Sequence, residues 1–362
     1  MDNFAFIIHP IDPKRDVSRK FPRLGKYLTV KQINFFSTFF PPLYISEITG
    51  IRSAATGTEI RGWFVACPYT PARMLELPEK TVYRKIVQTG KLAERLGARL
   101  LGLGAFTSVI GDAGLTIAKH LSIPVTTGDS YTVAVAVEAV REAARVMEIP
   151  LPTATAAVVG ATGAIGSVAA ELIAREVPRL WLIGRRTEAL EAVRARIAAQ
   201  TPAEVRISTE MSALAEADLI LTVTSAVDTV IEPEHLKPGA VVCDVARPRD
   251  VSAQVAAARD DVLVIDGGMV ATPGDVKFNF NFGFPPGMAY ACMAETMALA
   301  LEGRFESYTL GKNITVEQVE TIAQIAARHG FRLGGFRSFE RAVTPAQIER
   351  VRLAAQRARE KH

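Results

Sequence analysis

The sequence predicts an α/β protein with a doubly wound domain, a second α/β domain before it and helices at the C-terminal end. Short apolar, β-branched runs alternate with amphipathic helical segments in both halves of the chain. In the second half, a glycine-rich turn at 160–166 separates one such run from the next helix, which is the arrangement of a Rossmann-type fold.

Length and composition indicate an ordinary globular protein of two domains. The chain has 362 residues, of which 49% are hydrophobic and 22% charged. Three cysteines are too few for a disulfide framework, so we expect a reducing, cytoplasmic environment, and the histidines and cysteines show no metal-ligand spacing. We expect neither a signal peptide nor a membrane helix, because the longest uncharged run, 149–170, contains two prolines and three glycines.

Positive charge is concentrated near the C-terminus. Residues 332–362 carry eight Lys or Arg and three Glu, a balance of +5, so the net charge of +4 leaves about −1 for the rest. We therefore expect no nucleic-acid partner, because such proteins place a basic face on the folded core. Thr344 and Pro345 predict the start of a terminal helix. This basic tail could contact an acidic carrier protein or an anionic membrane, or be a solvated helix.

The predicted elements give three regions. In residues 1–150, the substrate domain, helices at 81–99 and 131–149 enclose strand–turn segments at 100–111 and 123–130. In residues 151–300, strands at 155–160, 179–185, 217–225, 240–246 and 262–268 alternate with helices, which predicts a parallel sheet. In residues 301–362, helices are expected to return toward the first domain. One of them spans 316–330.

The turn at 160–166 is the candidate dinucleotide site. Glycines there allow a tight turn and bring backbone N–H groups at a helix N-terminus onto a pyrophosphate. The residues are Gly160, Thr162, Gly163, Ala164, Ile165 and Gly166. The alternative is a tight turn that binds no ligand.

The end of the second strand favours NADPH over NADH. NAD-binding sites place an acid there, whereas this chain has Arg185, Arg186 and Thr187, which suit a 2′-phosphate. Solvated surface arginines are the alternative. Two further pairs of residues follow later strands of the same domain: Thr224 with Ser225, and Gly267 with Gly268. We expect them beside the dinucleotide, and the alternative is that they form ordinary loops.

Among the three cysteines, Cys292 is the candidate nucleophile. It is expected in the second turn of a helix that starts after Pro286, whereas Cys67 and Cys243 lie inside apolar strands. Spacing alone leaves Cys292 as either a nucleophile or a packing residue.

Several segments resemble the long-chain fatty acyl-ACP reductases, NADPH enzymes that convert acyl thioesters to aldehydes. They are FAFIIHP, TGTEIRGWFV, LGLGAFTSVIG, VTTGDSYT, VVGATGAIGS, VIDGGMV, YACMAE and GKNITVEQVETIAQIAARHGF, from near residue 4 to Phe331. The resemblance implies that Cys292 is acylated by an acyl-ACP or acyl-CoA, that NADPH then reduces the thioester, and that an aldehyde-consuming enzyme is a candidate partner.

Further roles follow from this mechanism. Backbone N–H groups of Thr127, Gly128, Asp129 and Ser130 are candidates to stabilise the oxyanion, and His329 is a candidate proton donor or a helix-end histidine. The loop reads TTGDSYT where the family is closer to TTGNTHT, so Asp129 adds a negative charge. The aromatic run INFFSTFFPPLY is expected in the core or in an acyl tunnel.

Two rival interpretations remain open from the sequence. A two-domain NADP-dependent carbonyl dehydrogenase of the shikimate or methylene-pterin type would use the same cofactor domain without a covalent step. A non-catalytic NADP-sensing protein would use it without a reaction.

Overall fold

The computed structural model describes residues 2–226 and 228–360, so Lys361 of the basic tail lies outside the described part. The described residues form two compact units. The first combines the chain up to Tyr131 with Val270–Ile314 and Glu320–Arg332; the second combines Thr132–Met269 with Thr315–Val319 and Leu333–His362.

This division differs from the expected boundaries at 150 and 300. The helix α8 (Asp129–Val146) runs from the first unit into the second, so the second unit begins before the Pro150 boundary. Residues 270–300, expected in the cofactor domain, belong to the first unit because α12 (Ala291–Leu301) packs on its sheet. Cys292 is therefore a residue of the first unit.

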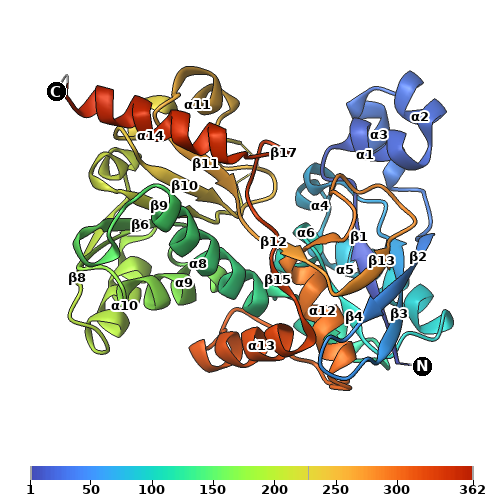
Figure 1. Ribbon diagram of the computed structural model, residues 1–362. Coiled ribbons are helices and arrows are strands. Elements are labelled where there is room, and N and C mark those ends of the chain that lie inside the picture. Colours follow the sequence, from blue (N-terminus) through green and yellow to red (C-terminus); the bar gives the residue numbers. More distant parts are fainter. Residues whose placement is uncertain (1, 227, 361–362) are drawn as a thin grey trace. The chain divides into compact units, whose positions relative to one another are not determined.

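The first unit is built on a six-stranded mixed sheet in the order β13-β2-β3-β1-β4-β5 (Figure 1). Its strands are β1 (Asn3–Ile8), β2 (Leu43–Arg52), β3 (Glu59–Ala66), β4 (Leu101–Gly102), β5 (Val125–Thr126) and β13 (Gly274–Lys277). The strands β3, β1, β4 and β5 are parallel, and β2 and β13 are antiparallel additions at one edge. The carboxyl ends of β1, β4 and β5 therefore meet at one edge of the sheet.

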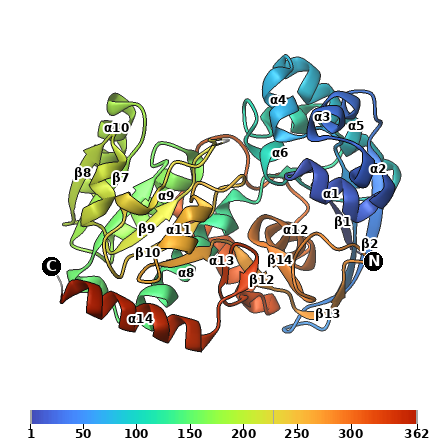
Figure 2. The ribbon, with the colours of Figure 1, turned by 90° about the horizontal axis from the view of Figure 1, so that it is seen from above.

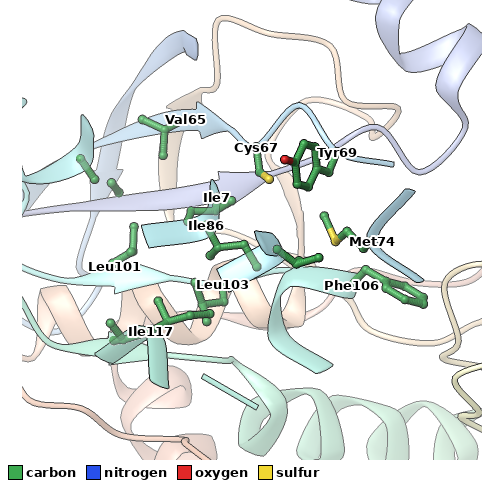
Figure 3. Packing of buried hydrophobic residues seen from close by; sticks show 14 of the residues in the cluster. Ile7, Val65, Cys67, Tyr69, Met74, Ile86, Leu101, Leu103, Phe106 and Ile117 are labelled. Atoms are coloured by element: carbon green, nitrogen blue, oxygen red, sulfur yellow. The ribbon is translucent and has the colours of Figure 1, made fainter. Parts of the chain in front are cut away.

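Alternating side chains of β1 pack on opposite faces of this sheet. Ala5 and Ile7 join a core cluster with α5 (Glu79–Arg95) and α7 (Leu115–Lys119), shown in Figure 3. Phe6 lies on the other face, where Gly102 leaves room for both its ring and Thr296 of α12. The helix that carries Cys292 thus rests directly on the central strands.

Further helices of this unit follow β1, β3 and β4. They are α1 (Pro13–Lys20), α2 (Pro22–Tyr27), α3 (Val30–Ser37), α4 (Pro71–Glu76) and α6 (Phe106–Val109). The first three lie side by side as a small group in both views (Figures 1 and 2). The expectation that the aromatic run at 33–44 packs in the core is wrong, because its four phenylalanines and Tyr44 are 42–71% exposed.

The second unit contains a fully parallel sheet in the order β11-β10-β9-β6-β7-β8. Its strands are β6 (Thr155–Val159), β7 (Arg179–Ile183), β8 (Glu204–Ser208), β9 (Leu219–Thr222), β10 (Val241–Asp244) and β11 (Leu263–Asp266). Counted from β6, this is the strand order 3-2-1-4-5-6 of the doubly wound fold. The predicted fold class is confirmed.

Helices connect these strands. They are α9 (Ala164–Ala174), α10 (Thr187–Ala198), α11 (Ala253–Ala258) and the 3-10 turns η1 (Leu151–Thr153), η2 (Met211–Glu216) and η3 (Pro233–His235). One face of the sheet is covered by η2, η3 and α11 through Leu214, Leu236 and Val255. The helix α9 contacts β6 and β7.

The remaining elements are short strands and the last helices. They are β12 (Met269–Ala271), β14 (Met288–Tyr290), β15 (Arg332–Leu333), β16 (Arg337–Ser338), β17 (Arg341–Ala342), α13 (Val316–His329) and α14 (Pro345–Arg359). Thr344 caps α14, as predicted, and Val351 and Ala355 of this helix are buried. None of the described helices is long and apolar enough to cross a bilayer.

Candidate active site and dinucleotide site

Cys292 is the second residue of α12 and is partly exposed. The prediction placed it in the second turn, after Pro286, but Met288–Tyr290 forms the strand β14 and the helix begins only at Ala291. The thiol therefore lies in the first turn, where the partial positive charge of the helix N-terminus acts most strongly.

The loop after β5 packs directly against this cysteine. Gly128 has φ +78°, and a Cβ added to it would lie 2.3 Å from the Cys292 Cα and 2.4 Å from its Cβ. Only glycine permits both the left-handed conformation and this close approach. The structure thus brings together two segments that the sequence separates by more than 160 residues.

A buried glutamate of α12 holds this loop. Glu295 is fully buried and accepts hydrogen bonds from the Thr126 hydroxyl, from Thr309 Oγ1 at 2.9 Å and from the Tyr131 N–H at 2.8 Å. The backbone of Gly128 also donates to it. Burial raises its pKa. Glu295 was not among the predicted site residues, although a carboxylate inside the apolar segment ACMAETMALAL was a signal for it.

Asp129 is the second buried carboxylate near the cysteine. Burial and then the charge of Glu295 raise the pKa of Asp129 to about 7. Burial, and then the charges of Asp129 and Glu295, raise the pKa of Cys292 to about 12. The thiol is therefore protonated at neutral pH, whereas Asp129, with its pKa of about 7, is partly protonated and partly ionised at that pH.

Two of the four predicted oxyanion donors are already used. The N–H of Thr127 donates to the Thr309 carbonyl at 2.9 Å, and that of Gly128 to Glu295. The N–H of Asp129 donates a long hydrogen bond, 3.4 Å, to Thr127 Oγ1. This N–H and that of Ser130, both in the first turn of α8, are the remaining candidates. The oxyanion role of this loop stays a prediction, with Asp129 and Ser130 as its candidate donors.

His329 does not lie beside Cys292. Its Nδ1 is 2.8 Å from Ser53 Oγ and its Nε2 is 2.8 Å from Glu302 Oε2, and the ring is 2% exposed. Glu302 caps the C-terminal end of α12, ten residues from Cys292, which is about 15 Å along a helix. These contacts make His329 a structural link at the far end of α12 and do not support its expected role as proton donor.

The other two cysteines are core residues, as expected. Cys67 has no exposed surface, and burial raises its pKa to about 11; Figure 3 shows it among Ile7, Tyr69 and Ile86. Cys243 lies in β10, is also fully buried, and its pKa is raised by burial. Cys292 is the partly exposed cysteine of the three.

In the second unit, the glycine turn has the geometry of a dinucleotide-binding loop. A Cβ on Gly160 would lie 2.6 Å from the Val223 carbonyl oxygen, and one on Gly166 would lie 2.3 Å from the Gly160 carbonyl oxygen. Gly163 caps α9, and Ala164 and Ile165 form its first turn. The N–H groups of Gly160 and Gly163 are bonded to the Ile183 and Gly160 carbonyls. The first-turn N–H groups of α9, from Ala164 on, have no carbonyl partner within the helix, so the turn fits a pyrophosphate there.

The arginine pair follows β7 beside this turn. Gly160 N–H donates to the Ile183 carbonyl at 2.9 Å, and Thr162 approaches Gly184. The next three residues, Arg185, Arg186 and Thr187, are exposed. NAD-binding proteins carry an acidic side chain at the end of this strand, and neither β7 nor residues 184–187 after it include one.

The segment after β9 is held by an aspartate that the sequence analysis missed. Asp250 is fully buried and accepts from Thr224 N at 2.8 Å, and from the hydroxyls of Thr222 and Thr224, each at 2.5 Å. Ser225 follows and is exposed. The switch point of the sheet, between β6 and β9, thus carries a fixed loop beside the glycine turn.

Gly267 and Gly268 follow β11 at the same edge of the sheet. A Cβ on Gly267 would lie 2.6 Å from the Val245 side chain, and Gly268 has φ +81°. The preceding Asp266 pairs with Arg249. Among the described residues, no cluster of His, Cys, Asp or Glu could hold a metal ion.

The parallel sheet and its glycine turn define a Rossmann-type dinucleotide-binding domain. The family model for shikimate / quinate 5-dehydrogenase matches residues 141–266, which lie in the second unit. Solved structures with similar folds include L-tryptophan dehydrogenase from Nostoc punctiforme, with 11% identity, 100% of this chain and 89% of that chain covered, and a TM-score of 0.41.

Sequence relatives identify the family. The chain is 31% identical over 345 residues to the long-chain acyl-[acyl-carrier-protein] reductase of Synechococcus elongatus, with 91% of this chain and 98% of that protein covered. It is also 31% identical over 283 residues to the aminotransferase PigE of a Serratia strain, covering 77% of this chain and 33% of that protein. The chain belongs to the long-chain acyl-[acyl-carrier-protein] reductase family.

Proposed function

We propose that this protein reduces a long-chain acyl thioester, carried by acyl carrier protein or coenzyme A, to the aldehyde with NADPH, through a thioester on Cys292. The packing of Gly128 against Cys292 carries this proposal. It joins the partly exposed residue Cys292, in the first turn of α12, to the first turn of α8, which supports one site with a nucleophile and backbone N–H donors.

The first half-reaction transfers the acyl group to the enzyme. The Cys292 sulfur attacks the thioester carbonyl, the bond to the carrier sulfur breaks, and the carrier leaves as a thiol. Because the pKa of Cys292 is raised to about 12, a neighbouring group must take its proton. Asp129 suits this role, because its pKa of about 7 lets it accept the proton and return it to the leaving sulfur.

The second half-reaction releases the aldehyde. When bound, NADPH supplies the hydride that the thioester carbon accepts. The N–H groups of Asp129 and Ser130 would stabilise the developing oxyanion, and collapse of the thiohemiacetal returns the Cys292 thiol. Gly160, Gly163 and Gly166 would hold the pyrophosphate, and Arg185 and Arg186 the 2′-phosphate.

A series of aromatic rings near Cys292 favours a substrate with a long apolar acyl chain. Phe64, Phe278, Phe282, Phe284 and Tyr290 contact one another in sequence, with ring centroids 4.3–5.8 Å apart along this path. Tyr290 caps α12, two residues before Cys292. The apolar surface of this series suits an alkyl chain, whose burial is worth about 0.8 kcal/mol per methylene.

The deciding experiment is intact-protein mass spectrometry after incubation with a long-chain acyl-CoA without NADPH. We expect an added acyl mass on the wild type, its loss in Cys292→Ser, and its retention in Cys67→Ser. Added NADPH should discharge the adduct and yield aldehyde. A carbonyl dehydrogenase without a covalent step, or a non-catalytic NADP sensor, would form no adduct with any of these proteins.

A further inference from the structure

The segment from Pro13 to Tyr44 exposes an unusual amount of apolar surface. No residue of α1 is buried, and α2 buries only Gly25. Large apolar side chains of this segment are 39–75% exposed: Phe21, Leu24, Tyr27, Val30, Phe35, Phe36, Phe39, Phe40 and Tyr44. Apolar surface gathered in this way marks an interaction site.

The helix α3 shows that this exposure is organised. Its inward residues Ile33 and Ser37 are buried. Lys31, Phe35 and Phe39 are spaced four residues apart and exposed, with Phe39 in the turn after the helix. The Phe35 ring centroid lies 5.4 Å from that of Phe36 and 5.5 Å from that of Phe39, so these three exposed rings form one cluster.

The same segment is strongly basic. Residues 13–44 carry seven Lys or Arg and a single acid, Asp16, which gives a charge of +6, and Asp16 pairs with Arg19 at 2.8 Å. Six of the basic residues are exposed: Lys14, Arg15, Lys20, Arg23, Lys26 and Lys31. Aromatic side chains interleaved with Lys and Arg are the composition of helices that lie in the interface of an anionic bilayer.

The segment also adjoins the aromatic series of the proposed acyl site. A Cβ on Gly283 would lie 2.6 Å from Arg19 Nη2 of α1, and Ser46 Oγ donates to the Phe278 carbonyl at 2.8 Å. The loop with Phe278, Phe282 and Phe284 therefore lies against the basic, aromatic segment. Under the proposed function, a bilayer at this surface would be next to the route of an alkyl chain.

We propose that the segment Pro13–Tyr44 binds the surface of an anionic lipid bilayer, with its helices in the interface. The apolar side chains enter the acyl–headgroup boundary and the basic side chains contact lipid phosphates. The C-terminal helix α14 is less suited, because Arg352 pairs with Glu148 and Arg359 donates to the Pro238 carbonyl.

The test is co-sedimentation of the full-length protein with phosphatidylcholine vesicles, with or without about a third of phosphatidylglycerol. We expect binding to the anionic vesicles that weakens with salt. Lys26→Ala with Lys31→Ala should weaken it about 30-fold, taking about 1 kcal/mol for each charge. Phe35→Ser with Phe39→Ser should also reduce binding at least tenfold, with the thermal unfolding midpoint unchanged because both side chains are exposed.

The matched control removes two charges from the basic tail. Arg350→Ala with Arg357→Ala, both exposed on α14, should leave vesicle binding unchanged. Cys292→Ser should bind vesicles like the wild type, so failure of the proposed reaction and failure of this proposal are separable. Absence of binding to anionic vesicles would overturn the proposal, and so would an equal loss of binding in the α14 control. It would also be overturned if Phe35→Ser with Phe39→Ser left vesicle binding unchanged and altered only the oligomeric state or the binding of an acidic protein.

Discussion

Gly128 lies so close to Cys292 that no additional carbon atom fits between the loop after β5 and the start of α12. A Cβ on Gly128 would meet backbone and side-chain atoms of Cys292 at 2.3–2.8 Å, none of which is the end of a flexible side chain. The position of the thiol therefore depends on the residue at 128 as much as on α12 itself.

Gly128→Ala should abolish acylation of Cys292. The new Cβ must displace the loop or the start of α12, and a shift of about 1 Å at a reacting group costs on the order of 100-fold in rate. The measurement is the rate of acyl adduct formation by mass spectrometry. Dinucleotide binding, followed by fluorescence, should be unchanged because the glycine turn lies in the second unit.

Gly97→Ala is the matched control. Gly97 has φ +87°, but no atom lies within 4 Å of an added Cβ. Gly97→Ala should lose about 1–2 kcal/mol of stability from left-handed backbone strain. Gly128→Ala should lose at least as much, because its Cβ also meets Cys292, and only this variant should lose acylation. Normal acylation by Gly128→Ala would remove the structural basis of the proposed function.

Glu295→Gln should destabilise the loop at Gly128, which the Glu295 carboxylate holds by hydrogen bonds. The amide keeps one acceptor for Thr126 and Thr309 but places an NH₂ group against the N–H of Tyr131. An unsatisfied buried N–H costs about 1–3 kcal/mol, so the thermal unfolding midpoint should fall. Thr309→Ser retains the hydroxyl and should change the midpoint little; equal losses in both variants would contradict this account.

The sequence predicted the second unit well because its signals are local. The strand β6, the turn at Gly160–Gly166 and the helix α9 are consecutive, so a window of about 20 residues contains the pattern. The alternation of strands and helices then predicted a parallel, doubly wound sheet, whose strand order the structure supplies.

The first unit was less predictable because its parts come from distant segments. Glu295 bonds to Thr126 across 169 positions and to Tyr131 across 164, and no local pattern reports such pairs. Pro286 suggested a helix start that the strand β14 delays. From the sequence His329 could be a proton donor, a hydrogen-bond partner or a helix-end histidine. Its partners Ser53 and Glu302, which distinguish these roles, can be seen only in the structure.

Replacing Arg185 and Arg186 with Ala should weaken the binding of NADPH far more than the binding of NADH. Both arginines are exposed beside the glycine turn, and only NADPH carries the 2′-phosphate that they would bind. Two charge-assisted contacts of about 1.5–3 kcal/mol each predict a loss of at least 100-fold in NADPH affinity. The comparison is titration of both cofactors into wild type and variant; parallel losses would argue against the NADPH assignment.

Asp129→Asn should make the protein more stable and less reactive at the same time. Burial and the nearby Glu295 raise the pKa of Asp129 to about 7 from its ordinary 3.8, so the folded state holds this proton more tightly than the unfolded chain. The stability linked to it is complete below about pH 4 and is lost as the pH rises through 7. Asparagine resembles the protonated form and should therefore raise the unfolding free energy at pH 8 by up to about 4 kcal/mol, with little effect at pH 4.

The same substitution removes the group proposed to take the proton of Cys292. Wild-type acylation should rise with pH through about 7 as Asp129 ionises. In Asp129→Asn the increase should move to higher pH, toward the pKa of the Cys292 thiol, which burial still raises after the charge of Asp129 is removed. Denaturation at pH 4 and pH 8, together with adduct formation between pH 6 and pH 9, separates the two effects. A variant that is stabilised at pH 8 but acylates with the wild-type pH profile would show that Asp129 is a buried charge without a part in the proton transfer.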